Sequence, residues 1–240
     1  MRSAIVTGGS GGIGSAICRA LCREGYHVTV CYNEGRKKAE DLVSELVSSG
    51  ASAEAVRCDV RSEADIVSAV ETASSAGPLS VTVNCAGISL FSQLQDTSSS
   101  ELNNIFAVNS IGSFLMCREA AKKMIPNHYG RIINISSMWG IAGASCESAY
   151  SSSKASVIGL TKALAKELGP SGITVNCIAP GLIDTPMNSR LSEEDIADLI
   201  EATPAGRIGT PEDIAAAVVF FCNASFVTGQ TLCIDGGMTL

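Results

Sequence analysis

The sequence predicts an α/β domain with a doubly wound parallel sheet of about seven strands and helices on both faces. Short apolar stretches alternate with longer amphipathic stretches along the chain, which is typical of βαβ units. The chain has 240 residues, 46% of them hydrophobic, which is enough for one sizeable core. No repeat, low-complexity tract or linker divides it. We therefore expect residues 1–240 to fold as a single domain.

The expected strands are short runs of apolar and β-branched residues. The first begins close to the start of the sequence and leads directly into a glycine-rich turn. Each later run is separated from its neighbours by a stretch that is long enough for a helix. In chain order the predicted strands are Ala4–Thr7, His27–Tyr32, Ala53–Cys58, Val81–Asn84, Arg131–Ser136, Thr174–Ile178 and Thr231–Ile234.

The stretches between these strands carry apolar residues at helical spacing. In chain order the predicted helices are Gly12–Glu24, Arg36–Ser49, Glu63–Ser75, Glu101–Met124, Tyr150–Leu168 and Pro211–Cys222. A further helix is expected at Ser192–Ala202, outside the regular alternation. It belongs to the segment 184–209, whose apolar residues predict a lid over the substrate.

A glycine-rich turn with the sequence TGGSGGIG occupies residues 7–14 and opens directly into a predicted helix. Glycines let the backbone approach a pyrophosphate, and the helix N-terminus offers free N–H groups to it. A sheet of this class binds its ligand beyond the carboxyl ends of the strands, where this turn lies. The turn therefore predicts a dinucleotide site with contacts from Gly8, Ser10, Gly12, Ile13 and Gly14.

Tyr150 and Lys154 lie one helical turn apart, so their side chains project from the same helix face. A free tyrosine has a pKa near ~10 and carries protons poorly at neutral pH. A nearby cation favours the phenolate and brings the pKa of the phenol closer to the working range. Together with the dinucleotide turn, the pair predicts a carbonyl–alcohol oxidoreductase.

The form TGxxxGxG resembles the short-chain dehydrogenase/reductase family, and the resemblance covers nearly the whole chain. It implies a single Rossmann-type domain and further cofactor contacts after the third, fourth and sixth strands. Cys85 stands where the family's NNAG motif has its second Asn. The implied contacts are Asp59 and Val60 beside the adenine, Asn84, Ala86 and Gly87 in the NNAG motif, and Pro180, Gly181, Ile183 and Thr185 beside the nicotinamide carboxamide.

The same resemblance implies a catalytic tetrad of Asn109, Ser137, Tyr150 and Lys154. Tyr150 would protonate the carbonyl oxygen while Ser137 hydrogen-bonds it, and such a donor contributes roughly 3–4 kcal/mol. Lys154 would lower the pKa of the tyrosine and hold the nicotinamide ribose, and both Tyr150 and Lys154 are implied cofactor contacts. Asn109 would anchor a water of the proton relay. Ser136 is the competing serine, but Ser137 fits the family spacing better, and a non-catalytic nucleotide sensor is the remote alternative.

The cofactor preference depends on the end of the second strand, where an acidic side chain would repel a 2′-phosphate. Tyr32 occupies that position here and Asn33 follows it, so both are predicted cofactor contacts. The basic residues 36–38 either supply positive charge or form an ordinary solvated helix turn. Gly11 stands where many NADP-dependent relatives carry an Arg. We predict a preference for NADP, with NAD as the alternative.

Two ketone substrates fit the resemblance, and the first is a 3-oxoacyl chain on acyl carrier protein. That carrier is acidic, whereas this chain has a net charge of −7 and needs a local basic patch to dock it. The 3-oxoacyl-[acyl-carrier-protein] reductases place basic residues just before the fifth and sixth strands. His128 and Ser171 are at those positions here, although Arg131, Lys162 and Lys166 can compensate.

The second substrate class follows from residues 137–150, SMWGIAGASCESAY. This loop is similar to that of a narrower group, the elongation factor P 5-aminopentanone reductases, whose substrate ends in a primary amine. Glu147 suits an ammonium group, and Trp139 is a second candidate substrate contact. A helix cap or subunit contact for Glu147, and packing for Trp139, are the alternatives. We favour the modified elongation factor as substrate over acyl carrier protein.

Charge and composition argue against other classes of protein. The net charge of −7 argues against nucleic acid as a partner. Ten cysteines are scattered without a CxxC pair or a Cys/His cluster, which predicts small buried residues and no metal site. No apolar run reaches the ~18 residues of a membrane span, and the N-terminus is a strand, not a signal peptide. We expect a cytoplasmic protein without membrane contact, and the resemblance implies a homotetramer.

Overall fold

A computed structural model describes residues 1–189 and 191–240. Within these residues one parallel sheet has the strand order β3-β2-β1-β4-β5-β6-β7. The chain changes direction across the sheet between β1 and β4, which is the topological switch point of this class. The strands are β1 (Ser3–Thr7), β2 (His27–Tyr32), β3 (Ala53–Arg57), β4 (Leu79–Asn84), β5 (Gly130–Ile135), β6 (Ile173–Pro180) and β7 (Thr231–Ile234).

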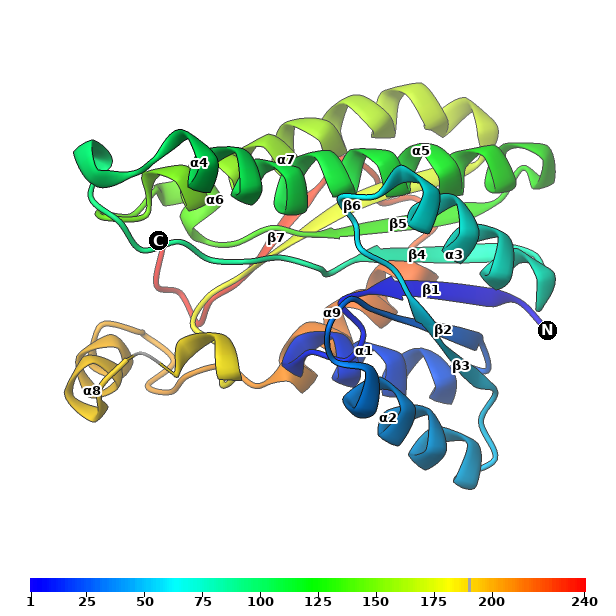
Figure 1. Ribbon diagram of the computed structural model, residues 1–240, viewed down its shortest axis with the longest axis horizontal. Helices are drawn as coiled ribbons and strands as arrows, with labels where there is room; N and C mark the ends of the chain where they lie inside the picture. Colours follow the sequence, from blue (N-terminus) through cyan, green and yellow to red (C-terminus); the bar gives the residue numbers. More distant parts are fainter. Residues whose placement is uncertain (190) are drawn as a thin grey trace.

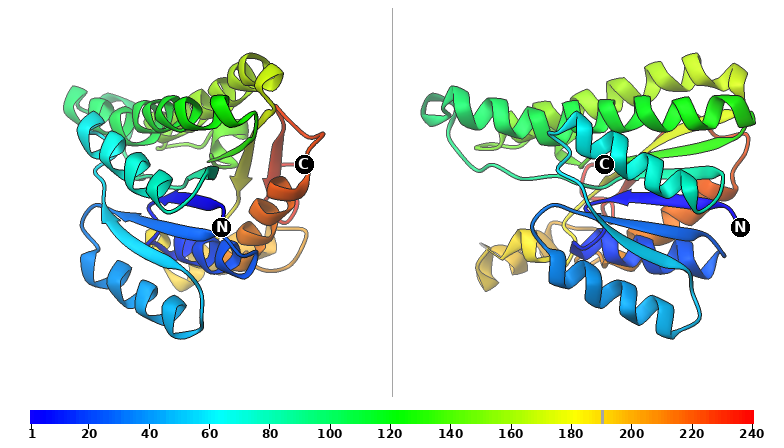
Figure 2. Two further views of the ribbon diagram at one scale, coloured as in Figure 1. Left: turned by 90° about the vertical axis from the view of Figure 1, so that its right-hand side faces the viewer. Right: turned by 45° about the vertical axis from the view of Figure 1, so that its right-hand side comes forward.

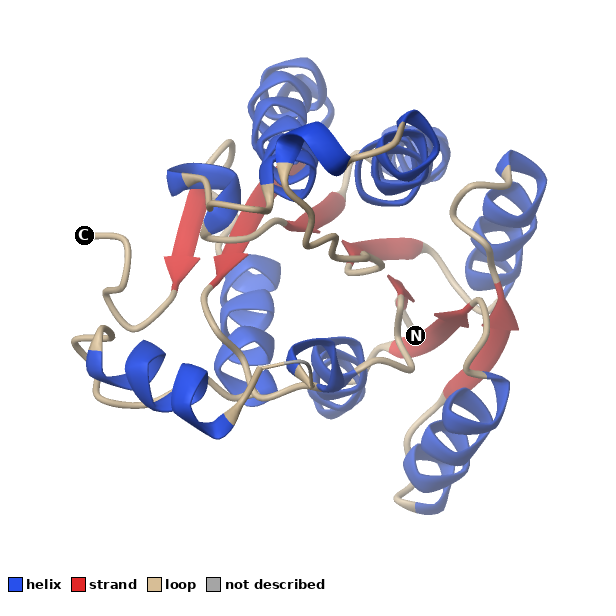
Figure 3. Ribbon diagram, turned by 60° about the vertical axis from the view of Figure 1, so that its left-hand side comes forward, coloured by secondary structure: helices blue, strands red, loops and turns tan. Residues whose placement is uncertain are grey.

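Helices cover both faces of the sheet, which confirms the predicted fold class (Figures 1 and 3). One face carries α1 (Gly12–Arg23), α2 (Arg36–Ser48) and α9 (Pro211–Asn223). The other face carries α3 (Glu63–Ser75), α5 (Gly112–Met124) and α7 (Ser148–Leu168). Toward the carboxyl ends of the strands lie α4 (Ser99–Phe106), α6 (Trp139–Ala142) and α8 (Glu193–Glu201).

The core has two layers because alternate residues of each strand point to opposite faces. Ala4 and Val6 pack with α1, α2 and α9, whereas Ile5 packs with α3 and α5. All three side chains are fully buried. A fully buried isoleucine contributes about 1.5–3 kcal/mol of hydrophobic free energy. Both faces are covered, which explains why β1, β4, β5 and β6 are buried along their whole length.

The helix expected at Glu101–Met124 differs from the prediction in its middle. It begins at Ser99, where Ser98 and Glu101 form a capping box, and a π-helical turn over Ala107–Ile111 separates α4 from α5. One extra residue in a turn leaves no mark on the apolar periodicity, so the sequence does not reveal it. The short helix α6 was also not expected.

The two ends of the segment 184–209 meet at a narrow base after β6. Ile183 and Gly209 form an isolated parallel bridge, in which the Gly209 N–H donates to Leu182 O at 2.9 Å. Between them α8 confirms the predicted helix at Ser192–Ala202, and it lies apart from the sheet in the right-hand view of Figure 2. Residue 190, within this predicted lid, lies outside the described residues. Over the described ranges no helix has the length and apolarity that a membrane crossing needs.

Candidate active site

A cavity of about 1030 Å³ opens at the carboxyl ends of β1, β4, β5 and β6. It brings together most of the predicted site residues. From the predicted cofactor contacts, its lining includes Gly8, Ser10, Gly12, Ile13, Gly14, Tyr32, Asn33, Ala86, Gly87, Pro180, Gly181, Ile183 and Thr185. From the predicted catalytic and substrate residues, it includes Ser137, Tyr150, Lys154, Trp139 and Glu147.

The glycine turn fits a pyrophosphate because its backbone is both tight and exposed to the cavity. Gly8 has a φ of +63°, and a Cβ there would lie 2.9 Å from Ala86 Cα. A Cβ on Gly14 would lie 2.1 Å from Gly8 O, so only glycine fits. No side chain caps the first turn of α1, and that turn has no acidic residue. The N–H groups there are thus available to an anion.

Thr7 joins the two strands that flank the switch point. Its Oγ1 accepts hydrogen bonds from the backbone N–H groups of Cys85 and Ala86, both at 3.1 Å. The segment after β4 is therefore held against the glycine turn. We did not predict this role of Thr7, although a hydroxyl residue immediately before the glycines was visible in the sequence.

Lys154 and Tyr150 meet in the cavity as their spacing predicts. Lys154 is 95% buried, since only 5% of its surface is exposed, and its Nζ lies 5.8 Å from the centre of the Tyr150 ring. The ammonium donates to Ile135 O at 3.0 Å. Burial lowers the pKa of Lys154, and the nearby Cys85 and Cys177 act in the opposite direction. A second polar partner, such as a ribose hydroxyl, would stabilise the charged form here.

The two neighbouring serines have different hydrogen bonds. Ser136 donates its hydroxyl to Lys154 O at 2.8 Å and so ties β5 to α7. Ser137 instead accepts from the Trp139 N–H at 3.2 Å. That bond leaves the proton of the Ser137 hydroxyl available for a substrate oxygen, as a donor to a developing oxyanion requires.

Asn109 lies in the π-helical turn, outside the cavity lining, and 1% of its surface is exposed. Its Oδ1 accepts from the Ile88 N–H at 2.9 Å, and its Nδ2 donates to Ile88 O at 3.0 Å and to Ser153 Oγ at 2.9 Å. The amide thus joins the segment after β4 to α7. Because both amide protons are used, its side chain positions neighbouring groups, and a relay water would need its carbonyl. The carbonyl in question is the main-chain oxygen of Asn109, to which the Ser113 hydroxyl donates at 2.8 Å.

Ser153 is a site residue that we missed. Its hydroxyl accepts from Asn109 and donates to Tyr150 O at 2.7 Å, so it links two members of the predicted tetrad. It precedes Lys154 by one residue and follows Tyr150 by three. A helix places residues three apart on neighbouring positions, which is the signal that was available.

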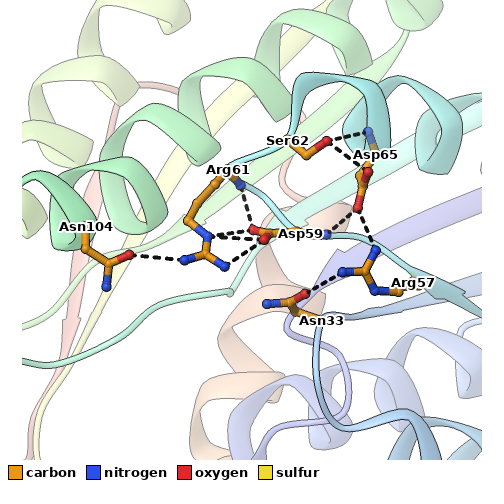
Figure 4. A network of polar contacts seen from close by, with 7 residues as sticks. All are labelled: Asn33, Arg57, Asp59, Arg61, Ser62, Asp65 and Asn104. Carbon is orange, nitrogen blue, oxygen red and sulfur yellow. Dashed lines mark hydrogen bonds and ion pairs between the residues drawn. The ribbon is translucent and has the colours of Figure 1, made fainter.

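Three predicted cofactor contacts lie outside the cavity lining. Asn84 is buried, and its side-chain amide donates to Asn134 Oδ1 on the neighbouring strand β5 at 2.8 Å. Val60 packs against Gly112, where a Cβ would lie 2.9 Å from it. The carboxylate of Asp59 pairs with Arg61 at 2.7 Å, and this hydrogen bond lowers the pKa of Asp59. Figure 4 shows this pair in a network that also contains Asn33, Arg57, Ser62, Asp65 and Asn104.

The three basic residues after β2 do not have the same environment. Arg36 pairs with Glu40 at 2.7 Å, and Lys37 pairs with Asp41 at 3.1 Å. Lys38 lines the cavity. Along the described chain, no ion pair involves Lys38. It is therefore the cation of this run that faces the end of the cavity near Tyr32 and Asn33.

The cysteine and metal predictions can be compared with the described residues. Among these the ten cysteines form no disulfide, and no group of His, Cys, Asp or Glu is arranged to hold a metal ion. Cys85 lines the cavity, and burial raises the pKa of its thiol to about 11, with Lys154 acting in the opposite direction. The thiol of Cys85 is therefore protonated at neutral pH, which makes it a poor nucleophile.

Comparisons with known proteins agree with the motifs. A family model described as enoyl-(acyl carrier protein) reductase matches residues 8–239. The 3-oxoacyl-[acyl-carrier-protein] reductase FabG of Staphylococcus aureus is 39% identical over 99% of this chain and 98% of that protein. A solved 3-oxoacyl-[acyl-carrier protein] reductase from Brucella melitensis has a TM-score of 0.93 at 31% identity, covering 100% of this chain and 91% of that one.

A mutant of a short-chain dehydrogenase/reductase from Serratia marcescens is also similar, with a TM-score of 0.93 and 35% identity. The match covers 100% of this chain and 98% of that one. The family expected from the glycine turn and the Tyr–Lys pair is thereby confirmed. Sequence, fold and cavity agree along almost the whole length, and the chain belongs to the short-chain dehydrogenase/reductase family.

Proposed function

We propose that this protein reduces a 3-oxoacyl chain carried on an acyl carrier protein, with NADPH as the hydride donor. Membership of the family makes it an NAD(P)-dependent oxidoreductase that acts on carbonyl or alcohol groups. The observation that carries the substrate is the 39% identity, over nearly full length, to a 3-oxoacyl-[acyl-carrier-protein] reductase. This reverses the order that we favoured from the loop 137–150, because no comparison supports modified elongation factor P.

The catalytic roles proposed for the tetrad follow from its contacts. When bound, the nicotinamide cofactor supplies the hydride. Tyr150 donates a proton to the carbonyl oxygen, and the free O–H of Ser137 hydrogen-bonds the same oxygen. Lys154 holds the phenol and a ribose hydroxyl with the N–H groups that Ile135 O does not use. Asn109 and Ser153 position this pair, and we propose that the Asn109 carbonyl holds the relay water.

The proposed NADP preference rests on the cavity end near Tyr32. Lys38 is the basic residue there whose charge is not matched by a carboxylate one turn away, because its i+4 neighbour is Leu42. NAD-dependent enzymes usually have an acidic residue at this position of the second strand, whereas this chain has Tyr32. A 2′-phosphate thus meets the Lys38 ammonium without a carboxylate at the Tyr32 position, while Glu34 is the acidic residue that also lines this end of the cavity. We include Asp59, Val60 and Asn84 as indirect supports, since the Asp59 and Asn84 side chains bond other residues and the Val60 side chain packs against Gly112.

A ketone that bears a primary amine is the second candidate, because one carboxylate lines the cavity and helix α8 of the predicted lid is acidic. Glu147 lines the cavity. In the sequence, no basic residue occurs between 191 and 206. Helix α8 has five exposed carboxylates, those of Glu193, Glu194, Asp195, Asp198 and Glu201. Acidic side chains attract an ammonium group and repel an acidic carrier protein.

The residues expected to compensate for the missing basic patch do not all do so. Arg131 was one of these, but it is buried and donates to Cys222 O and Gly130 O. That expectation was wrong, because the Arg131 guanidinium is held between Cys222 of α9 and the Tyr129 ring, 4.5 Å from the ring centre. His128 and Ser171 precede β5 and β6, at the amino ends of these strands, whereas the cavity lies at their carboxyl ends. Lys162 and Lys166 are exposed on α7.

Side-by-side kinetics test the proposed substrate. NADPH consumption is followed with acetoacetyl-acyl carrier protein and with 5-aminopentanone-modified elongation factor P at matched concentrations. We expect the carrier-borne substrate to have the higher kcat/KM by at least about 10-fold, which equals about 1.4 kcal/mol of transition-state binding. A reversed preference would reject the acyl-carrier assignment and favour the ketone that bears a primary amine. An absence of turnover with both ketones would reject ketone reduction of either kind.

The predicted assembly and the single functional domain also remain proposals. Gly159 is in the middle of α7, and a Cβ there would meet no atom within 4 Å. A mid-helix glycine costs about 1 kcal/mol relative to alanine, and close approach of another helix would offset it. Ile111 and Phe114, at the start of α5, are half exposed. These features support self-association through α5 and α7, which sedimentation analysis can measure.

A further inference from the structure

The predicted lid has a second support besides its base. Residues 235–239 follow β7 and form a turn, which we call the Asp235 turn. The Ala205 N–H donates to Gly236 O at 3.0 Å. A Cβ on Gly236 would lie 2.6 Å from Thr203 Cγ2, and one on Gly237 would lie 3.2 Å from Pro204 Cγ. Residues 203–205, just after α8, therefore rest directly on this turn.

The same turn contacts the wall of the cavity. The Gly181 N–H donates to Ile234 O at 2.9 Å. A Cβ on Gly181 would lie 2.6 Å from the Asp235 Cα, so the two backbones are in close contact. Gly181 itself lines the cavity. One short turn thus touches both the cavity wall and the far end of the lid.

The carboxylate of Asp235 holds the turn together. Its Oδ1 accepts from the Gly237 N–H at 2.9 Å, and its Oδ2 accepts from Thr239 twice, from the N–H at 2.9 Å and from the hydroxyl at 2.6 Å. Burial acts to raise the pKa of Asp235, but these hydrogen bonds outweigh it and the pKa is lowered. Gly236 and Gly237 have φ values of +67° and +91°, which favour glycine. The turn is therefore specified by its own residues.

We propose that Asp235 is a positioning residue, which sets the resting place of the substrate lid relative to the cavity wall at Gly181. This inference rests on the proposed function in one respect, namely that the lid 184–209 covers the substrate. Loss of the Asp235 turn frees residues 203–205 and lets α8 move away from the cavity. The tetrad, which α7 and β5 hold, keeps its geometry.

Hydrogen exchange of the free protein tests the coupling without reference to any substrate. Asp235→Asn keeps the shape of the side chain but removes the acceptor that Thr239 uses. We expect the amides of Thr203, Ala205 and Gly206 to exchange about 10-fold faster in this variant, because their opening becomes easier. Thr239→Val removes the hydroxyl and should act in the same direction, whereas Thr239→Ser retains it and should exchange as the wild type does.

The matched control is Asp65→Asn, at the start of α3. Asp65 also accepts from a hydroxyl and a backbone N–H, those of Ser62 and Asp59, but it lies far from the lid in sequence and position. Its substitution should leave the exchange of residues 203–206 unchanged. Equal acceleration in Asp65→Asn would overturn the proposal, since the effect would then be a general loss of stability. Unchanged exchange in both Asp235→Asn and Thr239→Val would also overturn it.

Kinetics then test the consequence for the site. With acetoacetyl-acyl carrier protein, Asp235→Asn should raise the KM about 10-fold and change kcat by less than about 3-fold, because substrate binding and not chemistry is affected. Thr239→Ser, which keeps the hydroxyl, should have the wild-type KM. A drop in kcat at unchanged KM would contradict a positioning role. If exchange accelerates as expected but the wild type reduces no carrier-borne ketone, the proposed function fails while the coupling stands.

Discussion

The wall of the cavity formed by β1, β4, β5 and α7 is held by buried contacts, whereas the lid 184–209 is held mainly at its ends. On the first wall, Thr7, Asn109 and Lys154 each bond a backbone group of another element. On the lid, α8 has no buried residue. Preformed dipoles and donors lower the cost of reorganisation during reaction, so a rigid wall suits the chemistry. A weakly held segment suits binding and release.

Ser137→Ala should have the largest effect, because it removes a donor from the rigid wall. We expect kcat to fall about 10²–10³-fold, as when one oxyanion donor is lost, with little change in the KM for NADPH. Steady-state kinetics with acetoacetyl-acyl carrier protein measure this. Ser136→Ala is the neighbouring comparison. The Ser136 hydroxyl donates to the Lys154 carbonyl instead, so kcat should fall less in this variant. A larger loss in Ser136→Ala would exchange the roles of the two serines.

Asn109→Ala should mainly affect stability. The substitution leaves the backbone groups of half-buried Ile88 and the buried hydroxyl of Ser153 without the Asn109 amide, and each unsatisfied buried group costs about 1–3 kcal/mol. We expect the free energy of unfolding to fall by about 3 kcal/mol, and Tm to drop by about 6–12 °C for a chain of this size. Thermal unfolding followed by circular dichroism measures both. An unchanged Tm would mean that the rigid wall does not depend on this clamp.

The rigid wall could largely be predicted from the sequence, since its motifs depend on fixed spacings. Gly8 and Gly14 are forced by close backbone contacts, and Tyr150 and Lys154 meet because they are one helical turn apart. The π-helical turn at Asn109 could not be predicted, because one inserted residue does not change which positions are apolar. The direction of the Asn84 side chain was also missed, although alternation along β4 places it on the face of the sheet that α5 covers.

The basic run 36–38, at the cofactor end of the cavity, was interpreted incompletely, because a charge alone does not specify its partner. Glu40 and Asp41 follow Arg36 and Lys37 by four residues, so those two ion pairs are visible in the sequence. Lys38 is left to face the cavity. By contrast, the contact between residues 203–205 and the Asp235 turn joins distant parts of the chain, and no local pattern indicates it.

Lys38→Ala sharpens the comparison at the cofactor end. Removal of the cation should weaken NADPH binding about 10-fold, or about 1.4 kcal/mol, and leave NADH binding nearly unchanged. Titration of the bound-cofactor fluorescence measures both dissociation constants. Lys37→Ala is the matched control, because the Lys37 side chain is 88% exposed and pairs with Asp41. Equal effects of the two substitutions would remove the special role of Lys38.

Asp213→Asn should have the smallest effect, because it alters an exposed pair at the base of the lid. Asp213 pairs with Arg207 at 2.8 Å and caps α9 through Thr210, and these contacts hold its pKa well below the ordinary value. We expect a loss of about 0.5–1 kcal/mol at pH 7.

The pH dependence of this loss has a defined sign. A lowered pKa means that the stabilisation is present above the ordinary aspartate value of about 3.9 and is lost as the pH falls through the lowered value. The difference in Tm between wild type and Asp213→Asn should therefore shrink below about pH 4. A difference that grows on acidification would contradict the assignment of this carboxylate.

Turnover of acetoacetyl-acyl carrier protein by the wild type and by Tyr150→Phe tests the central claim most directly. The wild type should oxidise NADPH in the presence of this substrate. Tyr150→Phe should lose at least about 10²-fold in kcat, as expected when a general acid is removed, while it binds NADPH with nearly the same affinity. A phenylalanine variant that keeps most of its turnover would contradict the proposal that the rigid wall carries the chemistry through Tyr150.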